Sequence, residues 1–179
     1  RLHKTLGLGG DFMYCVEPKI DGAGISAVYE NGKLVRLLTR GDGTKGDDIT
    51  RNAFVLRNLP MRLTGTNVPS LLEIRGEAYM TRAEFDRLSA AAISKNSEAQ
   101  NSIPDNSRKS PYANPRNLAA GTLKLLDKNV LEQRNLQVIF YSFGAVEGFT
   151  LRRQSELAEI LRNWGLPSFS WTKLAQGPH

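Results

Sequence analysis

The feature that most constrains this chain is a hairpin signal close to its beginning. Two stretches that suit β-strands, Ala23 to Glu30 and Lys33 to Thr39, are separated only by Asn31-Gly32. An Asn-Gly pair favours a tight type I′ turn, because both central residues of that turn must adopt positive φ. We therefore expect two antiparallel neighbouring strands, around which the rest of the fold must be arranged.

The remaining segments mix strand and helix signals without a regular βαβ repeat. Further strands are expected at Phe12 to Lys19, Leu71 to Tyr79 and Leu136 to Phe143. Helices are expected at Ile49 to Arg57 (ending before Pro60), Arg82 to about Lys95, Leu118 to Leu126 and Leu151 to Trp164. Thr81 and Glu84 have the spacing of a capping box at the second of these helices. This order predicts an α+β fold with mostly antiparallel sheets and flanking helices.

The chain has the length of one domain, and we expect residues 1–179 to form a single, partial one. The segment 96–110 is rich in Ser, Asn, Asp and Pro and predicts an exposed, mobile loop. No apolar run approaches the roughly 20 residues of a membrane span, and no signal peptide is recognised. These features predict a protein without a membrane partner.

The composition excludes several kinds of site. Cys15 is the only cysteine, so neither an internal disulfide nor a cysteine-based zinc site can form, and a reducing, cytoplasmic setting fits. The only histidines, His3 and His179, are at opposite ends of the chain, which argues against a histidine triad. The formal net charge of +6 suits a polyanionic partner, although many soluble domains are equally basic.

The sharpest local motif is Glu17-Pro18-Lys19-Ile20-Asp21-Gly22. It places a lysine at a predicted strand end, before a glycine-containing turn. A protonated lysine cannot attack an electrophile, but an amine in a desolvated or cationic surrounding becomes a nucleophile. The motif alone also fits a structural lysine that pairs with Glu17 or Asp21.

Three other segments strengthen the interpretation as a binding site. Arg40 precedes glycines that let a backbone approach a ligand. In Glu73-Ile74-Arg75-Gly76-Glu77 the charged side chains share one strand face, with a glycine at the point of closest approach. Arg116 lies near a predicted helix start, where an anion is favoured. Each segment has an ordinary structural explanation, but all of them together, in one basic domain with no other catalytic set, are hard to explain as chance.

Lys19-Ile20-Asp21-Gly22 is the Lys-x-Asp-Gly signature of nucleotidyltransferases, which include DNA ligases, RNA ligases and capping enzymes. The longer stretches VEPKIDGAGISAVYENGKLVRLLTRGDGTKGDDIT, LEIRGEAYM and YANPRNLAAGTLKLLD resemble the adenylation domain of bacterial NAD-dependent DNA ligase. This similarity runs in order from about Asp11 to Pro167. It implies a nucleotidyltransferase core of the ATP-grasp-like ligase type, truncated at the C-terminus.

The resemblance implies a catalytic role for Lys19, which would attack the α-phosphate of NAD, release nicotinamide mononucleotide and hold AMP. The AMP would then pass to the 5′-phosphate of a DNA nick, as in DNA replication and repair. Asp21 is the second implied catalytic residue. The implied adenosine and ribose contacts are Glu17, Gly22, Arg40, Glu77 and Tyr141, and the implied DNA or phosphate contacts are Arg116, Lys124 and Asp47.

The resemblance also implies NAD and Mg²⁺ as cofactors and nicked double-stranded DNA as partner. It predicts a monomer with no protein partner. No metal-ligand residues are predicted, since Mg²⁺ keeps most of its waters and needs few protein ligands.

The sequence departs from the family pattern at a few positions. Asp47 stands where the family more usually has Glu, and Lys124 where it has Arg, so the planar fork that suits phosphate is lost. Ala23-Gly24 is also unusual and could loosen the second strand. The family's later lysine motifs and its N-terminal nicotinamide-binding subdomain are not found in these residues, so this stretch alone is expected to be weakly active or inactive.

Two alternatives remain at this stage. One is a relative that uses ATP or GTP, such as an RNA ligase or capping enzyme. The other is a non-catalytic DNA-binding remnant, which would explain the basic charge and would bind duplex DNA regardless of Lys19→Ala.

Overall fold

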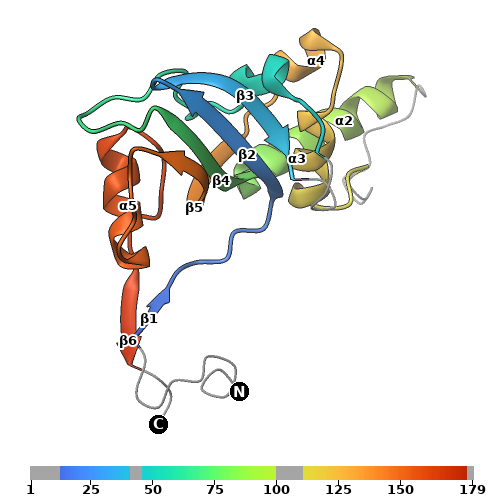
Figure 1. Cartoon of the computed structure of the whole chain (residues 1–179). Helices are drawn as coiled ribbons and strands as arrows, with labels where there is room; N and C mark the ends of the chain where they lie inside the picture. The colour runs from blue at the N-terminus through green and yellow to red at the C-terminus, as the bar shows by residue number, and fades with distance from the viewer. Residues whose placement is uncertain (1–12, 41–45, 100–110, 177–179) are drawn as a thin grey trace.

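The computed structural model describes residues 13–40, 46–99 and 111–176, with residues 95–99 described by their backbone alone. It confirms an α+β fold built on antiparallel sheets (Figure 1). The elements are β1 (Met13–Val16), β2 (Ala23–Glu30), β3 (Lys33–Thr39), the 3₁₀ helix η1 (Thr50–Val55), β4 (Leu71–Tyr79), α2 (Arg82–Ala99), α3 (Pro115–Leu123), α4 (Lys128–Glu132), β5 (Gln137–Glu147), α5 (Gln154–Asn163) and β6 (Lys173–Gln176).

Two sheets organise the described part of the chain. The larger has the strand order β3-β2-β4-β5, and every neighbouring pair is antiparallel. The smaller pairs β1 with β6 and projects from the body of the molecule (Figure 1). The segment that carries Lys19 connects the two sheets, because it runs from the end of β1 to the start of β2.

The predicted hairpin is confirmed. β2 and β3 have the expected bounds, and the intervening Asn31 and Gly32 have φ of 48° and 74°. The strand expected at Leu71 to Tyr79 also has its predicted bounds, as β4. These elements were predictable because their turn chemistry and side-chain alternation are local properties of the sequence.

The hydrophobic core lies between the larger sheet and the helices that cover it. Fully buried strand residues include Ile25, Tyr29, Ile74 and Phe140, and helix α3 packs against β2 and β4. The hydroxyl of Tyr29 donates a hydrogen bond to the Pro60 carbonyl at 2.8 Å. Burial raises the pKa of Tyr29, so the phenol stays protonated and keeps this bond.

Several element boundaries differ from those predicted. The first strand covers only Met13–Val16, and the segment from Glu17 to Asp21 has no regular structure. The helix expected at Ile49 to Arg57 is the 3₁₀ helix η1. Backbone hydrogen bonds connect its two ends to Leu37 of β3 and to Leu136 before β5. A short segment held at both ends suits the tighter 3₁₀ form, which occurs mostly in short pieces.

Helix α3 begins three residues earlier than expected. The side chain of Asn114 accepts a hydrogen bond from the Asn117 amide at 2.8 Å, and Pro115 occupies the first turn, where its missing N–H costs nothing. Helix α5 is shorter at both ends than the predicted Leu151 to Trp164. Helix α4 and strand β6 were not predicted at all, since each is only a few residues long.

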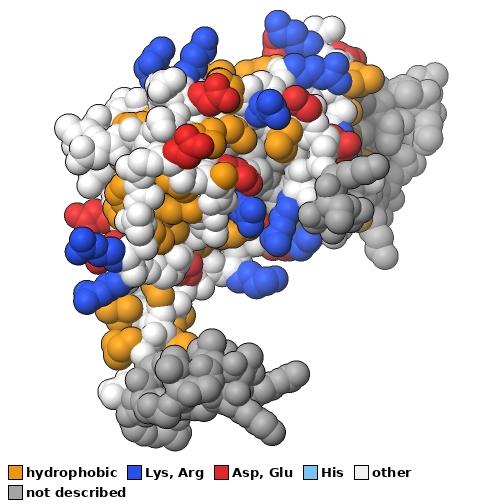
Figure 2. Space-filling view, in the orientation of Figure 1, with side chains coloured by type: hydrophobic (Ala, Val, Ile, Leu, Met, Phe, Trp, Pro, Cys, Tyr) orange, Lys and Arg blue, Asp and Glu red, His pale blue; other side chains and the backbone are white. Residues whose placement is uncertain are grey.

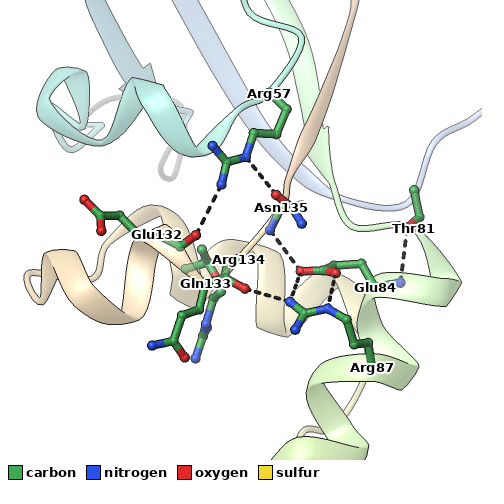
Figure 3. Close-up of polar contacts among 9 residues, drawn as sticks. Arg57, Thr81, Glu84, Arg87, Glu132, Gln133, Arg134 and Asn135 are labelled. Atoms are coloured by element: carbon green, nitrogen blue, oxygen red, sulfur yellow. Dashed lines mark hydrogen bonds and ion pairs between the residues drawn. The ribbon is translucent and has the colours of Figure 1, made fainter.

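Helix α2 continues to Ala99, so the first four residues of the segment 96–110 are helical and not a loop. The remainder of that segment lies outside the described residues. Only half of the predicted capping box forms: the Glu84 amide donates to the Thr81 hydroxyl at 3.2 Å. The Glu84 carboxylate instead accepts hydrogen bonds from Arg87, as Figure 3 shows.

The Glu84 carboxylate joins α2 to the segment that links α4 and β5 (Figure 3). Arg87 donates two hydrogen bonds to it, each of 2.8 Å, and the Asn135 amide donates a third of 3.0 Å. Arg87 also donates to the Gln133 carbonyl, and Arg57 binds the neighbouring Asn135 side chain. This cluster stabilises the fold and lies apart from the cavities described next.

Candidate active site

A cavity of about 540 Å³ lies between the larger sheet and the segment that follows β1. Its lining comes from the Lys19 segment, the end of β3, the end of β4, the start of α3, β5 and the segment after α5. The lining residues are Cys15, Glu17, Pro18, Lys19, Ile20, Arg40, Glu77, Arg116, Tyr141 and Phe169. Three of these side chains are cationic and two are carboxylates, so the lining as a whole is positively charged.

Lys19 lines this cavity although its side chain is exposed to solvent. Arg40 and Glu77, which the sequence analysis placed around the same ligand, line it as well. Lys19 therefore shares an open site with a guanidinium and a carboxylate. Its exposed side chain is accessible to a ligand that enters the cavity.

Strand β5 supplies Tyr141, whose hydroxyl donates to the Glu77 carboxylate at 3.3 Å. Burial, together with the neighbouring Glu77 carboxylate, raises the pKa of Tyr141. The phenol therefore remains protonated at neutral pH and continues to donate. This contact fixes Glu77 and the Tyr141 ring on one wall of the cavity.

Asp21 and Gly22 lie beside the cavity and hold its edge in place. The Asp21 carboxylate accepts a hydrogen bond from Arg116 at 3.1 Å. Gly22 is buried against β4, and a Cβ placed there would lie 2.3 Å from the Ala78 carbonyl oxygen. Only glycine permits this approach, which gives the glycine of the Lys-x-Asp-Gly motif a steric reason.

A second cavity of about 280 Å³ adjoins the first and shares Arg40, Glu77 and Arg116 with it. Lys124, at the end of α3, also lines this cavity, and its amine lies 2.6 Å from the Asp47 carboxylate. Two of the positions that depart from the family pattern, Asp47 and Lys124, are thus paired with each other. Asp47 itself lines neither cavity, and it contacts the second one only through its ion pair with Lys124.

The unusual glycine at position 24 does not interrupt β2, which pairs regularly with β4 through Gly24. Its carbonyl accepts the Arg40 amide at 2.8 Å, and a Cβ there would approach the Arg40 side chain to 3.2 Å. The absence of a side chain at Gly24 leaves room for Arg40 to lie between the two cavities.

The family model for the adenylation domain of NAD-dependent DNA ligases matches residues 1–179. The chain belongs to this family. The structure brings the motifs around Lys19, Glu77 and Arg116, on which the resemblance rests, to one cavity.

Relatives of known name support the same assignment. The chain is 41% identical over 172 residues to a DNA ligase of Pseudomonas paraeruginosa, covering 96% of this chain and 20% of that protein. It is 42% identical over 180 residues to a DNA ligase of Rhodospirillum rubrum, covering 99% of this chain and 24% of the relative. It is 44% identical over 159 residues to DNA ligase 2 of Opitutus terrae, covering 88% of this chain and 21% of that relative. The chain thus spans about a fifth to a quarter of these relatives.

The structure also places residues at the site that the sequence analysis did not select. Cys15, Ile20 and Phe169 line the first cavity, and the Gln154 side chain bonds two of its lining residues. Burial, together with Glu17, raises the pKa of the Cys15 thiol, which therefore stays protonated. A lone glutamine at the start of an amphipathic helix carries no functional signal in a sequence, so Gln154 could be found only from its contacts.

The described residues contain no group of three or more His, Cys, Asp or Glu side chains arranged to hold a metal ion. No helix in the described ranges is long and apolar enough to cross a membrane.

Proposed function

We propose that this domain transfers AMP from NAD to Lys19, as the first step of DNA ligation. The observation that carries the proposal is the single cavity shared by Lys19, Arg40, Glu77 and Tyr141. The proposal includes the finer assignment of the larger sheet to an ATP-grasp-like nucleotidyltransferase core.

The lining of the cavity suits the parts of an adenylate donor. Lys19, Arg40 and Arg116 provide positive charge for phosphate oxygens, and Arg can bind such oxygens with two parallel hydrogen bonds. Glu17 and Glu77 provide acceptors for the hydroxyl and amino groups of adenosine, and Tyr141 provides an aromatic face. The family assignment favours NAD over ATP as the donor.

In the proposed reaction, the Lys19 amine attacks the α-phosphorus of NAD. A P–N bond forms, the P–O bond to nicotinamide mononucleotide breaks, and the departing phosphate takes the electron pair. Arg40 and Arg116 stabilise the negative charge that grows on the phosphate oxygens. The amine must lose its protons for this step, and the open face of the cavity allows water to accept them.

Mg²⁺ would supply further charge neutralisation at the phosphates. Because the described residues hold no carboxylate cluster for it, we propose that it binds mainly through phosphate oxygens and water. In the next step, AMP would pass to the 5′-phosphate of a nick in duplex DNA. We place that phosphate near Arg116 and Lys124, which line the second cavity.

The test is self-labelling of the intact protein with NAD that carries radioactive phosphate in its adenylate half. We expect labelling of the natural protein from NAD but not from ATP, and none in Lys19→Ala or Lys19→Arg, because a guanidinium stays protonated. Lys33→Ala is the matched control, since Lys33 is an exposed lysine of β3 outside both cavities. Label on the Lys19→Ala protein would refute the proposal.

A further inference from the structure

The side chain of Gln154 joins two walls of the proposed NAD site. Its amide nitrogen lies 3.1 Å and 3.4 Å from the two carboxylate oxygens of Glu17, and 3.1 Å from the carbonyl oxygen of Tyr141. A glutamine amide has two N–H donors, so one can serve the carboxylate and the other the carbonyl. Glu17 and Tyr141 are both cavity-lining residues, from segments far apart in the sequence.

The segment that Gln154 holds is the one that carries Lys19. Residues 17–21 have no regular secondary structure, so their position depends on the contacts of their side chains. Downstream of Lys19, Arg116 binds Asp21 and Gly22 packs against β4. Upstream, the Glu17 carboxylate is held by Gln154, while the Cys15 thiol is a weaker neighbour at 3.9 Å.

The partners of Gln154 also explain why it is suited to this task. Its backbone begins helix α5, and the Tyr141 carbonyl that it binds belongs to β5, against which α5 packs. A rigid helix–strand unit therefore presents the donor to the irregular segment. The hydrogen bond from Gln154 to the Glu17 carboxylate is charge-assisted, and such bonds are stronger than those between two neutral groups.

We propose that Gln154 is a positioning residue for the nucleophile: by binding Glu17 and the β5 backbone together, it fixes the distance of Lys19 from the opposite wall of the cavity. This inference rests on the proposed adenylate transfer to Lys19. Gln154 does not contact the reacting atoms in this scheme, and it acts through Glu17.

The experiment measures the single-turnover rate of self-adenylation of the intact protein at saturating NAD, and the NAD concentration for half-maximal rate. Gln154→Leu keeps a similar volume but removes both donors. We expect the rate constant to fall about tenfold to a hundredfold, because a small misplacement of a reacting group has costs of this order. The half-saturating concentration is expected to change less than the rate constant.

Gln154→Glu gives a signature that a merely structural role would not produce. It places a second carboxylate against Glu17, so the pair repels at neutral pH and shares a proton in mildly acidic solution. The shared proton restores the hydrogen bond between the two side chains. The rate of Gln154→Glu relative to the natural protein should therefore rise as the pH is lowered from about 8 to about 5.

The matched control is Gln133→Glu, the same chemical change at the exposed end of α4, outside both cavities. Its rate relative to the natural protein is expected to remain close to one at every pH. Thermal unfolding of all three variants reports whether the start of α5 is damaged.

The possible outcomes separate this inference from the proposed function. If the natural protein takes up no label from NAD, both proposals are wrong. If it labels well and Gln154→Leu labels equally fast, only the positioning role is wrong. A slower Gln154→Glu protein whose relative rate does not change with pH, and whose melting temperature falls, would also overturn the positioning role, since Gln154 would then serve only to start the helix.

Discussion

Gly22 is the residue at which steric fit most directly controls the site. A methyl group there would lie 2.3 Å from the Ala78 carbonyl and 2.9 Å from the Glu77 side chain. We expect Gly22→Ala to lower the free energy of unfolding by about 1 to 3 kcal/mol, because backbone must move to admit the methyl group. Urea denaturation measures this change, and the shift of Glu77 should slow self-adenylation as well.

The control for this prediction is Gly121→Ala. Gly121 lies in helix α3, and a Cβ there would have nothing within 4 Å. We expect the free energy of unfolding of this variant to rise by about 0.5 to 1 kcal/mol, because alanine loses less backbone entropy than glycine when a helix folds. Equal effects of the two substitutions would show that chain entropy, and not contact with β4, determines the role of Gly22.

At the scale of elements, the Glu84 cluster ties α2 to the α4–β5 segment and makes stability depend on pH. Hydrogen bonds from Arg87, followed by that from the Asn135 amide, lower the pKa of Glu84 below its ordinary value of 4.5. The unfolded chain therefore binds this proton at a higher pH than the folded protein does. The stabilisation is present above the ordinary pKa and is lost as the pH falls through the lower, folded-state pKa.

We accordingly expect Glu84→Gln to cost about 1.5 to 3 kcal/mol of unfolding free energy at neutral pH, the range for a lost charge-assisted hydrogen bond. The difference from the natural protein should shrink as the pH falls from about 5 to about 3. Denaturation curves across this range provide the measurement. A difference that is constant with pH would contradict the assignment to the ionised carboxylate.

The control at this scale is Glu132→Gln. Glu132 pairs with Lys128 at 3.6 Å on α4, and both side chains are exposed. Exposed ion pairs contribute roughly 0 to 1 kcal/mol, so this substitution should have little effect at any pH.

At the scale of the whole molecule, the question is where the basic residues behind the formal net charge of +6 lie. Figure 2 shows basic side chains interspersed with acidic ones over the visible face, so the charge forms no continuous basic stripe there. The cationic residues that matter for the proposed DNA contact are those in the second cavity, where Arg40, Arg116 and Lys124 face one carboxylate, Glu77.

The proposed DNA contact predicts how affinity of the intact protein for nicked duplex DNA depends on salt concentration. The logarithm of the affinity should fall linearly with the logarithm of salt concentration, and Lys124→Ala should reduce that slope by about one. Lys128→Ala is the control, because Lys128 is also ion-paired but lies outside the cavities. Equal slopes for these two variants would exclude Lys124 from the phosphate contacts.

The sequence by itself determined the parts of this protein that depend on neighbouring residues. The bounds of β2, β3 and β4, the Asn31-Gly32 turn and the Lys-x-Asp-Gly motif follow from turn chemistry, side-chain alternation and family resemblance. It also identified six of the residues that line the first cavity, from Glu17 to Tyr141. Their motifs are continuous in the chain and therefore visible without a structure.

Only the tertiary structure decided which distant groups meet. Gln154 reaches Glu17 across 137 positions, and Asp47 reaches Lys124 only because the end of α3 lies beside the end of the loop after β3. The short η1 and β6 likewise depend on backbone contacts with remote segments. Such contacts arise from sheet register and helix packing. Both depend on many residues distributed over the whole chain, so no single position in the sequence indicates them.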